Sequence, residues 1–142
     1  MGDYLAAAET EIRAMPAQVW TALTDPRQIK RYMFGTEVRT DWRQGSPITW
    51  SGEYQGKAYA DKGEIVEIDP ERRLVVTHFS PLTGQDDVPE NYHTLTYELT
   101  ERRGVTHLSL RQDKNASPEE AQHSTGTWEV LLAGLKKFVE QG

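Results

Sequence analysis

The apolar residues near the end of the chain follow the spacing of an amphipathic helix. Within residues 117–140 they recur with a period of about 3.6 residues, at Ala121, Trp128, Leu131, Leu132, Leu135, Phe138 and Val139. Ser117 is suited to cap the first turn, Pro118 to the first helical position and Glu120 to a capping box. Such a helix is roughly 36 Å long, so its apolar face needs a broad surface to cover it.

The middle of the chain changes to the two-residue period of β-strands. Strands are predicted at residues 4–13, 37–42, 47–54, 57–69, 74–79, 92–100 and 105–112. Two short helices are predicted between the first two strands, one ending at Asp25 and one at Gly35. Because the later strands follow one another through short turns, an antiparallel sheet is favoured, with the long helix across its concave side. The predicted fold class is therefore α+β.

Alternation along the strands separates an inward from an outward face. The apolar positions of the first strand are Leu5, Ala7 and then Ile12, which alternate loosely. In the strand 57–69, Val66 and Ile68 point the same way. Residues 80–91 contain prolines, a glycine and acids, so they are predicted to form a long exposed loop.

Composition narrows the possible functions. With 142 residues the chain is expected to form one domain over residues 1–142, and a net charge of −6 disfavours nucleic acid as a partner. The chain has no cysteine, which excludes disulfides, thiolate metal sites and a thiol nucleophile. No signal peptide and no membrane span are predicted, and the expected location is cytoplasmic.

Several motifs in a fixed order resemble a known family. They are IRAMPAQVWTALTDP at residues 12–26, YMFG at 32–35, GEIVEIDPERRLV at 63–75, THLSL at 106–110 and GTWEVLLAGL at 126–135. Together they resemble the START-like, or SRPBCC, superfamily, in the branch related to the C-terminal domain of the activator of heat-shock protein 90 ATPase. The resemblance implies a helix-grip fold, in which a curved antiparallel sheet of six to seven strands wraps the long C-terminal helix.

The resemblance also implies a largely apolar cavity between helix and sheet. Such cavities hold about 300–1,000 Å³, and alternation suggests which side chains would line this one. They are Tyr32, Met33, Phe34, Trp50, Tyr54, Val76, His78, His93, Leu95, Tyr97, Trp128, Leu131, Leu132 and Leu135. Of these, Tyr32, Met33 and Phe34 are expected at the mouth. The same pattern also fits an ordinary core filled by side chains.

His78 and His93 are the candidate catalytic residues. Both are expected to face inward on strands that pair, near Tyr54 and Tyr97, where they could bind a polar group or act as acid and base. The alternative is two hydrogen-bonded structural histidines near a strand end. No metal and no cofactor are expected, because no third ligand has suitable spacing and His107 should face outward.

Three functions stay open at this point. The first is binding of a small hydrophobic or amphipathic molecule in the cavity. The second is an enzyme of the cyclase, dehydratase or isomerase kind in the same cavity. The third is a module that stimulates a chaperone ATPase, which is disfavoured because the chain has room for one domain only. The free strand edge could pair two copies into a homodimer.

Overall fold

The computed structural model of the protein describes residues 4–141. Its elements, in chain order, are β1 (Tyr4–Ile12), α1 (Pro16–Thr24), α2 (Pro26–Tyr32), β2 (Glu37–Thr40), β3 (Pro47–Tyr54), β4 (Lys57–Asp69), β5 (Arg73–His78), β6 (His93–Arg102), β7 (Val105–Asn115) and α3 (Pro118–Gln141). Two single-turn 3₁₀ helices, Pro81–Thr83 and Pro89–Asn91, interrupt the loop between β5 and β6. The predicted elements are present, with ends shifted by up to three residues.

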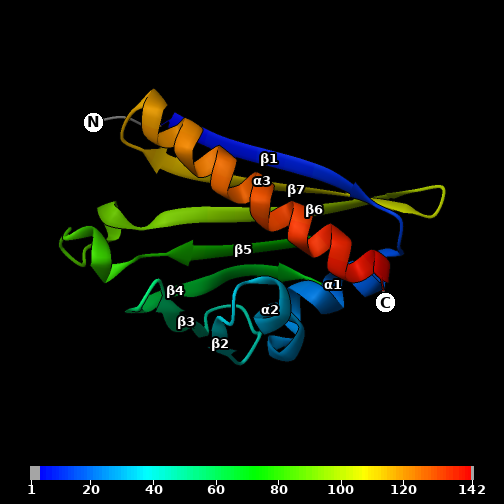
Figure 1. The fold of residues 1–142 in the computed structure, drawn as a ribbon, viewed down its shortest axis with the longest axis horizontal. Helices are drawn as coiled ribbons and strands as arrows, with labels where there is room; N and C mark the ends of the chain where they lie inside the picture. The colour runs from blue at the N-terminus through cyan, green and yellow to red at the C-terminus, as the bar shows by residue number, and fades with distance from the viewer. Residues whose placement is uncertain (1–3, 142) are drawn as a thin grey trace.

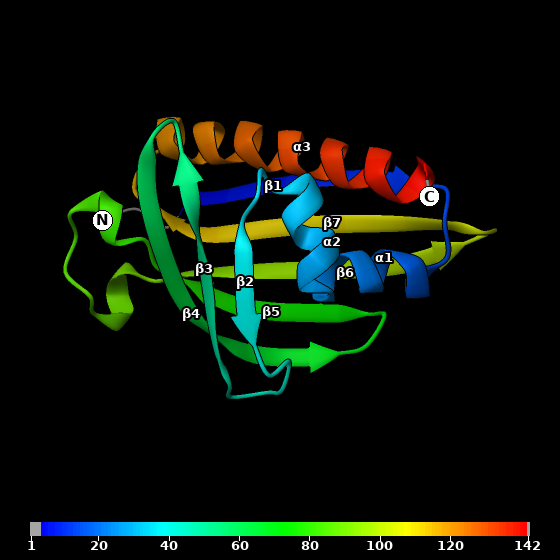
Figure 2. The same ribbon diagram turned by 60° about the horizontal axis from the view of Figure 1, so that its bottom comes forward.

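The strands form one curved antiparallel sheet in the order β1-β7-β6-β5-β4-β3-β2. The helix α3 runs over β1 and β7, and α1 and α2 lie at the end of the sheet near the C-terminus (Figure 1). Turned by 60°, the molecule shows the β3–β4 hairpin rising toward the N-terminal half of α3 (Figure 2). This arrangement is the predicted helix-grip fold.

The long helix begins as its sequence predicts and buries one face. The Ser117 hydroxyl accepts a hydrogen bond from the backbone N–H of Glu120 at 3.1 Å, while the Glu120 carboxylate accepts from the N–H of Ala116. Leu132 is 1% exposed, whereas Val130 on the opposite face is 61% exposed. Most of the apolar surface that α3 buries therefore lies in the C-terminal half of the helix, where Leu131, Leu132 and Leu135 are all buried.

A corner in β4 divides the sheet into two parts. Up to Glu64, β4 pairs with β3, and from Ile65 onward it pairs with β5. At Gly63 a Cβ atom would lie 1.7 Å from the backbone oxygen of Thr77, so only glycine fits there. This close approach lets β4 bend, and the bend carries the hairpin toward α3.

Two predicted strand faces were wrong. In β1 the buried residues are Ala6, Ala8 and Ile12, so Ile12 packs inward as predicted, whereas Leu5 and Ala7 are exposed. In β4 the sheet register shifts between Ile65 and Glu67, so Ile65 is buried and Val66 is exposed, although Ile68 still packs on the core. A bulge of this kind adds one residue and reverses the face of the residues before it relative to those after it.

Within the described residues, none of the helices combines the length and the apolar character that a membrane span needs.

Candidate functional site

Most of the space between α3 and the sheet is filled by side chains. A hollow of about 30 Å³ remains there, which is too small for an organic ligand. Its walls include eight of the residues predicted for a ligand cavity, namely Tyr32, Met33, Trp50, Val76, Tyr97, Leu131, Leu132 and Leu135. At this depth the structure therefore has a packed core.

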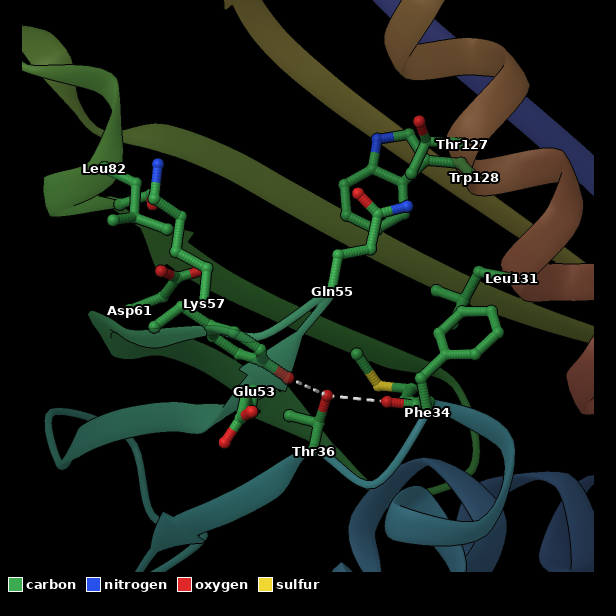
Figure 3. A pocket seen from close by; sticks show the side chains of 13 residues that line it. Phe34, Thr36, Glu53, Gln55, Lys57, Asp61, Leu82, Thr127, Trp128 and Leu131 are labelled. Atoms are coloured by element: carbon green, nitrogen blue, oxygen red, sulfur yellow. Dashed lines mark hydrogen bonds between the residues drawn. The ribbon is translucent and has the colours of Figure 1, made fainter.

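A second, larger pocket opens beside the core under the N-terminal half of α3. It has a volume of about 450 Å³ and is open to solvent. Thr127, Trp128 and Leu131 come from α3, and Met33, Phe34 and Thr36 come from the segment after α2. The other walls are Glu53, Gln55, Lys57, Tyr59 and Asp61 on the β3–β4 hairpin and Ser80 and Leu82 in the β5–β6 loop (Figure 3).

The apolar wall of this pocket is held in a fixed orientation. The Trp128 indole N–H donates to the side-chain oxygen of Gln112 at 2.6 Å, which fixes the ring above the pocket. Phe34 is 71% exposed and has a positive φ of 56°, a conformation that costs energy for a bulky residue.

The opposite wall is polar. Lys57, Tyr59 and Asp61 alternate along β4 and line the pocket, whereas Ala58 and Ala60 between them are exposed. The Tyr59 hydroxyl lies 2.5 Å from the buried hydroxyl of Thr36. A Cβ atom at Gly52 would lie 2.7 Å from the Tyr59 hydroxyl, so the Tyr59 side chain occupies space that a side chain at position 52 would need.

Asp61 also connects the pocket to one of the two candidate histidines. Its Oδ2 atom lies 2.8 Å from Nε2 of His78, and the His78 ring packs edge-on against Trp50 with ring centres 5.1 Å apart. The Asp61 side chain is 17% exposed. Its other oxygen, Oδ1, is buried and has no hydrogen-bond partner among residues 4–141.

His78 and His93 are paired positions in the sheet, as the sequence predicts, but they contact different groups. Nδ1 of His93 lies 2.8 Å from the backbone oxygen of Asp113 on β7. Neither histidine is among the described residues that line the open pocket. His107 lies on the outer face, with Nε2 3.5 Å from a carboxylate oxygen of Glu9, and His123 is exposed.

The tyrosines of the interior do not ionise near neutral pH. Burial raises the pKa of Tyr97 to about 12. Burial also raises the pKa of Tyr32 well above its ordinary value, and its hydroxyl donates to the backbone oxygen of Ala22 at 2.7 Å. Tyr32 is thus a buried residue of the hollow and does not stand at the mouth, where it was expected.

The loop between β5 and β6, which carries Leu82, is attached to the sheet through Asp87 and Tyr92. Phe79 and Tyr92 stack with ring centres 5.0 Å apart, and the Tyr92 hydroxyl donates to Asp87 at 2.6 Å. Asp87 also forms an ion pair with Lys62. Hydrogen bonds from Lys62 and Tyr92 hold the pKa of Asp87 below its ordinary value.

Sequence reasoning found one wall of the open pocket and missed the other. Met33, Phe34, Trp128 and Leu131 were predicted and line it. Leu95 is buried in the core, and the side chain of Tyr54 lies outside the described part of the structure. The residues that were missed are Thr36, Glu53, Gln55, Lys57, Tyr59, Asp61, Ser80, Leu82 and Thr127. A signal for three of them was present, because the strand 57–61 places charged and polar residues on the inward parity.

Across residues 4–141, no group of three or more histidine or acidic side chains is arranged to hold a metal ion.

Comparison with known proteins shows what the chain is similar to. The solution structure of ChR145 from Cytophaga hutchinsonii is 46% identical over 99% of this chain and 97% of that chain, with a TM-score of 0.87. CalU16 from Micromonospora echinospora is 22% identical, with a TM-score of 0.73 over 97% of this chain and 85% of that one. The Aha1 dimer from Colwellia psychrerythraea is 17% identical, with a TM-score of 0.75 over 96% of both chains. None of the curated proteins matches the sequence.

The family model agrees with the motifs and with the fold. The model described as activator of Hsp90 ATPase homolog 1-like protein matches residues 13–140, which is most of the chain. The helix-grip architecture also agrees with the START-like superfamily that the motifs resemble. The protein therefore belongs to the family of proteins like activator of Hsp90 ATPase homolog 1.

Proposed function

We propose that this protein binds a small amphipathic molecule in the open pocket beneath Trp128. The observation that carries the proposal is the pocket itself, whose volume of about 450 Å³ lies within the usual range for ligand sites. It combines an apolar wall from α3 and the end of α2 with a polar wall from β4. An apolar molecule with one polar end matches both walls.

The exposed side chains at the mouth support this function over an unoccupied surface hollow. Phe34 and Leu82 lie on different segments of the pocket wall, and both leave most of their surface to water. Covering such surface contributes about 25 cal/mol per Å². A ligand that reaches both residues would therefore gain affinity from surface that folding alone leaves exposed.

The experiment is native mass spectrometry of freshly purified protein. It is followed by organic extraction and identification of any compound that co-purifies with the protein. Titration with 8-anilinonaphthalene-1-sulfonate, an amphipathic fluorescent probe, then tests the place of binding. Phe34→Ala should weaken probe binding by about tenfold. Val130→Ala is the matched control, because Val130 is exposed on the far face of α3 and should leave probe binding unchanged. Equal affinities for wild type and Phe34→Ala would contradict the proposal.

Two alternatives give different results in the same preparation. An enzyme in this pocket would convert its ligand, and conversion would fall in His78→Ala. A chaperone-stimulating module would raise the ATPase rate of purified Hsp90, as the family description suggests. Native mass spectrometry also reports whether two copies associate. The Colwellia protein is described as a dimer, and homodimerisation and the cytoplasmic location of this chain stay predictions.

A further inference from the structure

We propose that Asp61, oriented by His78, binds a hydrogen-bond-donating head group, an ammonium or a hydroxyl, on an otherwise apolar ligand. This inference rests on the proposed function and names its ligand class. It begins from the juxtaposition of a mostly buried carboxylate with the apolar side chains of Trp128, Leu131 and Met33 in one pocket.

The first observation is the inverted alternation of β4. In a sheet with one covered face, apolar side chains normally point inward and polar ones outward. Along residues 57–61 the alanines are exposed, and the lysine, tyrosine and aspartate line the pocket. The inversion is confined to the hairpin half of the strand, since Ile65 beyond the corner is fully buried. The polar residues therefore face inward where the pocket lies and not elsewhere on β4.

The second observation is that Lys57, Tyr59 and Asp61 differ in how their polar atoms are already engaged with protein or water. Tyr59 is already engaged with Thr36. Lys57 is exposed, and its long side chain can keep the ammonium in water. Asp61 has a short side chain and is only 17% exposed, so it cannot withdraw from the pocket wall.

The third observation is the incomplete hydrogen bonding of Asp61. His78 occupies Oδ2, while Oδ1 is buried and without a partner among the described residues. Buried carboxylate oxygens normally accept hydrogen bonds. The terminal torsion of aspartate is broad, so a partial rotation of the carboxylate can bring Oδ1 toward the pocket while Oδ2 stays near His78. A hydrogen-bond donor on a ligand would give the second oxygen of Asp61 the partner that it lacks.

Lys57 provides the competing possibility. A ligand with a carboxylate head group would place it near Lys57 at the rim and would meet the charge of Asp61 if it entered further. The two possibilities predict opposite preferences among ligands with the same tail. The depth and the missing hydrogen bond of Asp61 favour the donor head group.

The experiment compares decylamine, 1-decanol and decanoate by isothermal titration calorimetry at neutral pH, below their aggregation limits. Decylamine and 1-decanol should bind about tenfold more tightly than decanoate, which corresponds to about 1.4 kcal/mol. Asp61→Leu removes the acceptor and should lower the affinity for both donors by about tenfold. Asp61→Asn keeps a neutral acceptor, so it should weaken decylamine more than 1-decanol. Asp69→Asn, an exposed acid at the other end of β4, is the control and should change nothing.

His78 is a positioning residue in this scheme, and its effect should depend on Asp61. His78→Gln should weaken decylamine binding in the wild-type background and have no effect in the Asp61→Leu background. A purely structural role of His78 would lower binding equally in both backgrounds. Circular dichroism melting curves check that each variant is folded, and Asp61→Asn takes the place of Asp61→Leu if the latter does not fold.

The outcomes separate this inference from the proposed function. Decanoate binding as tightly as decylamine, or donor affinities unchanged in folded Asp61 variants, overturns the inference and leaves the pocket function standing. Decanoate binding more tightly than decylamine, together with its loss in Lys57→Met, would assign the head group to Lys57 and also overturn the inference. If none of the three compounds binds to the wild type, both proposals fail.

Discussion

His78 and His93 are directly opposed on β5 and β6, yet each side chain bonds to a different neighbouring strand. His78 contacts Asp61 on β4, and His93 contacts the backbone of Asp113 on β7. An acid–base pair would need both rings to reach the same substrate atoms. In this arrangement only His78 is connected to a residue of the open pocket.

His93→Ala tests that separation. The substitution removes one side-chain hydrogen bond and should lower the free energy of unfolding by about 1 kcal/mol, measured by urea denaturation. Binding of the fluorescent probe should stay within about twofold of wild type. His123→Ala serves as the control, because His123 is exposed and should leave both quantities unchanged. A folded His93→Ala protein that no longer binds the probe would place His93 in the site after all.

A matched pair of substitutions on α3 tests how much each face of the helix contributes to the free energy of unfolding. Leu132→Ala should lower the free energy of unfolding by about 2–5 kcal/mol, because it leaves a cavity in the packed core. Val130→Ala removes a similar aliphatic side chain from the exposed face and should cost less than about 0.5 kcal/mol. Urea denaturation measures both, and equal losses would mean that the two faces of α3 are buried alike.

A pair of glycine substitutions tests the corner in β4. Gly63→Ala forces a Cβ atom against the backbone of Thr77 and should destabilise the protein by more than about 3 kcal/mol, or prevent folding. Gly126→Ala is the control within a helix, where a Cβ atom would meet no atom within 4 Å. That substitution should stabilise α3 by about 0.5–1 kcal/mol. Thermal melting distinguishes the two, and a Gly63→Ala protein as stable as wild type would refute the close approach.

Asp87→Asn tests the attachment of the loop that carries Leu82. Amide hydrogen exchange in residues 81–91 should become faster, while exchange in β6 and β7 stays unchanged. Because the pKa of Asp87 is lowered, its ionised form favours the attached loop, so its contribution is full above pH 3.8 and is lost as the pH falls through the lowered value. The pKa of Lys62 is raised, so its contribution is full below pH 10.5 and is lost as the pH rises through the raised value.

An unchanged exchange rate in the Asp87→Asn loop at neutral pH would mean that the stack of Phe79 on Tyr92 alone holds it. Tyr92→Leu is the companion variant for that case, because it removes the stacking and the hydroxyl together.

The fold could be predicted because its signals extend over many residues. Seven apolar positions of α3 and clean alternation in β6 and β7 leave few other arrangements. The errors arose where one residue changes the register. The bulge near Glu67 exchanged the faces of Ile65 and Val66, and nothing in the local sequence marks a bulge without a glycine at that point.

The pocket was harder to predict than the core for a physical reason. Periodicity finds residues that face inward, but it does not say whether the space they face is filled. Trp50, Val76 and Tyr97 face the sheet interior as predicted and close around a small hollow. The open pocket instead depends on how far the β3–β4 hairpin bends toward α3, and the periodicity of the strands does not report the bend of β4 near Gly63.

Because β4 belongs to both parts of the sheet, the strand that carries one wall of the pocket also lies against β5. At its corner, Gly63 approaches the backbone oxygen of Thr77 so closely that a Cβ atom would not fit. Thr77 leads within two residues to Phe79, the base of the loop that carries Leu82. A continuous path of contacts and chain therefore joins the two sides of the mouth, the β3–β4 hairpin and the segment that carries Leu82.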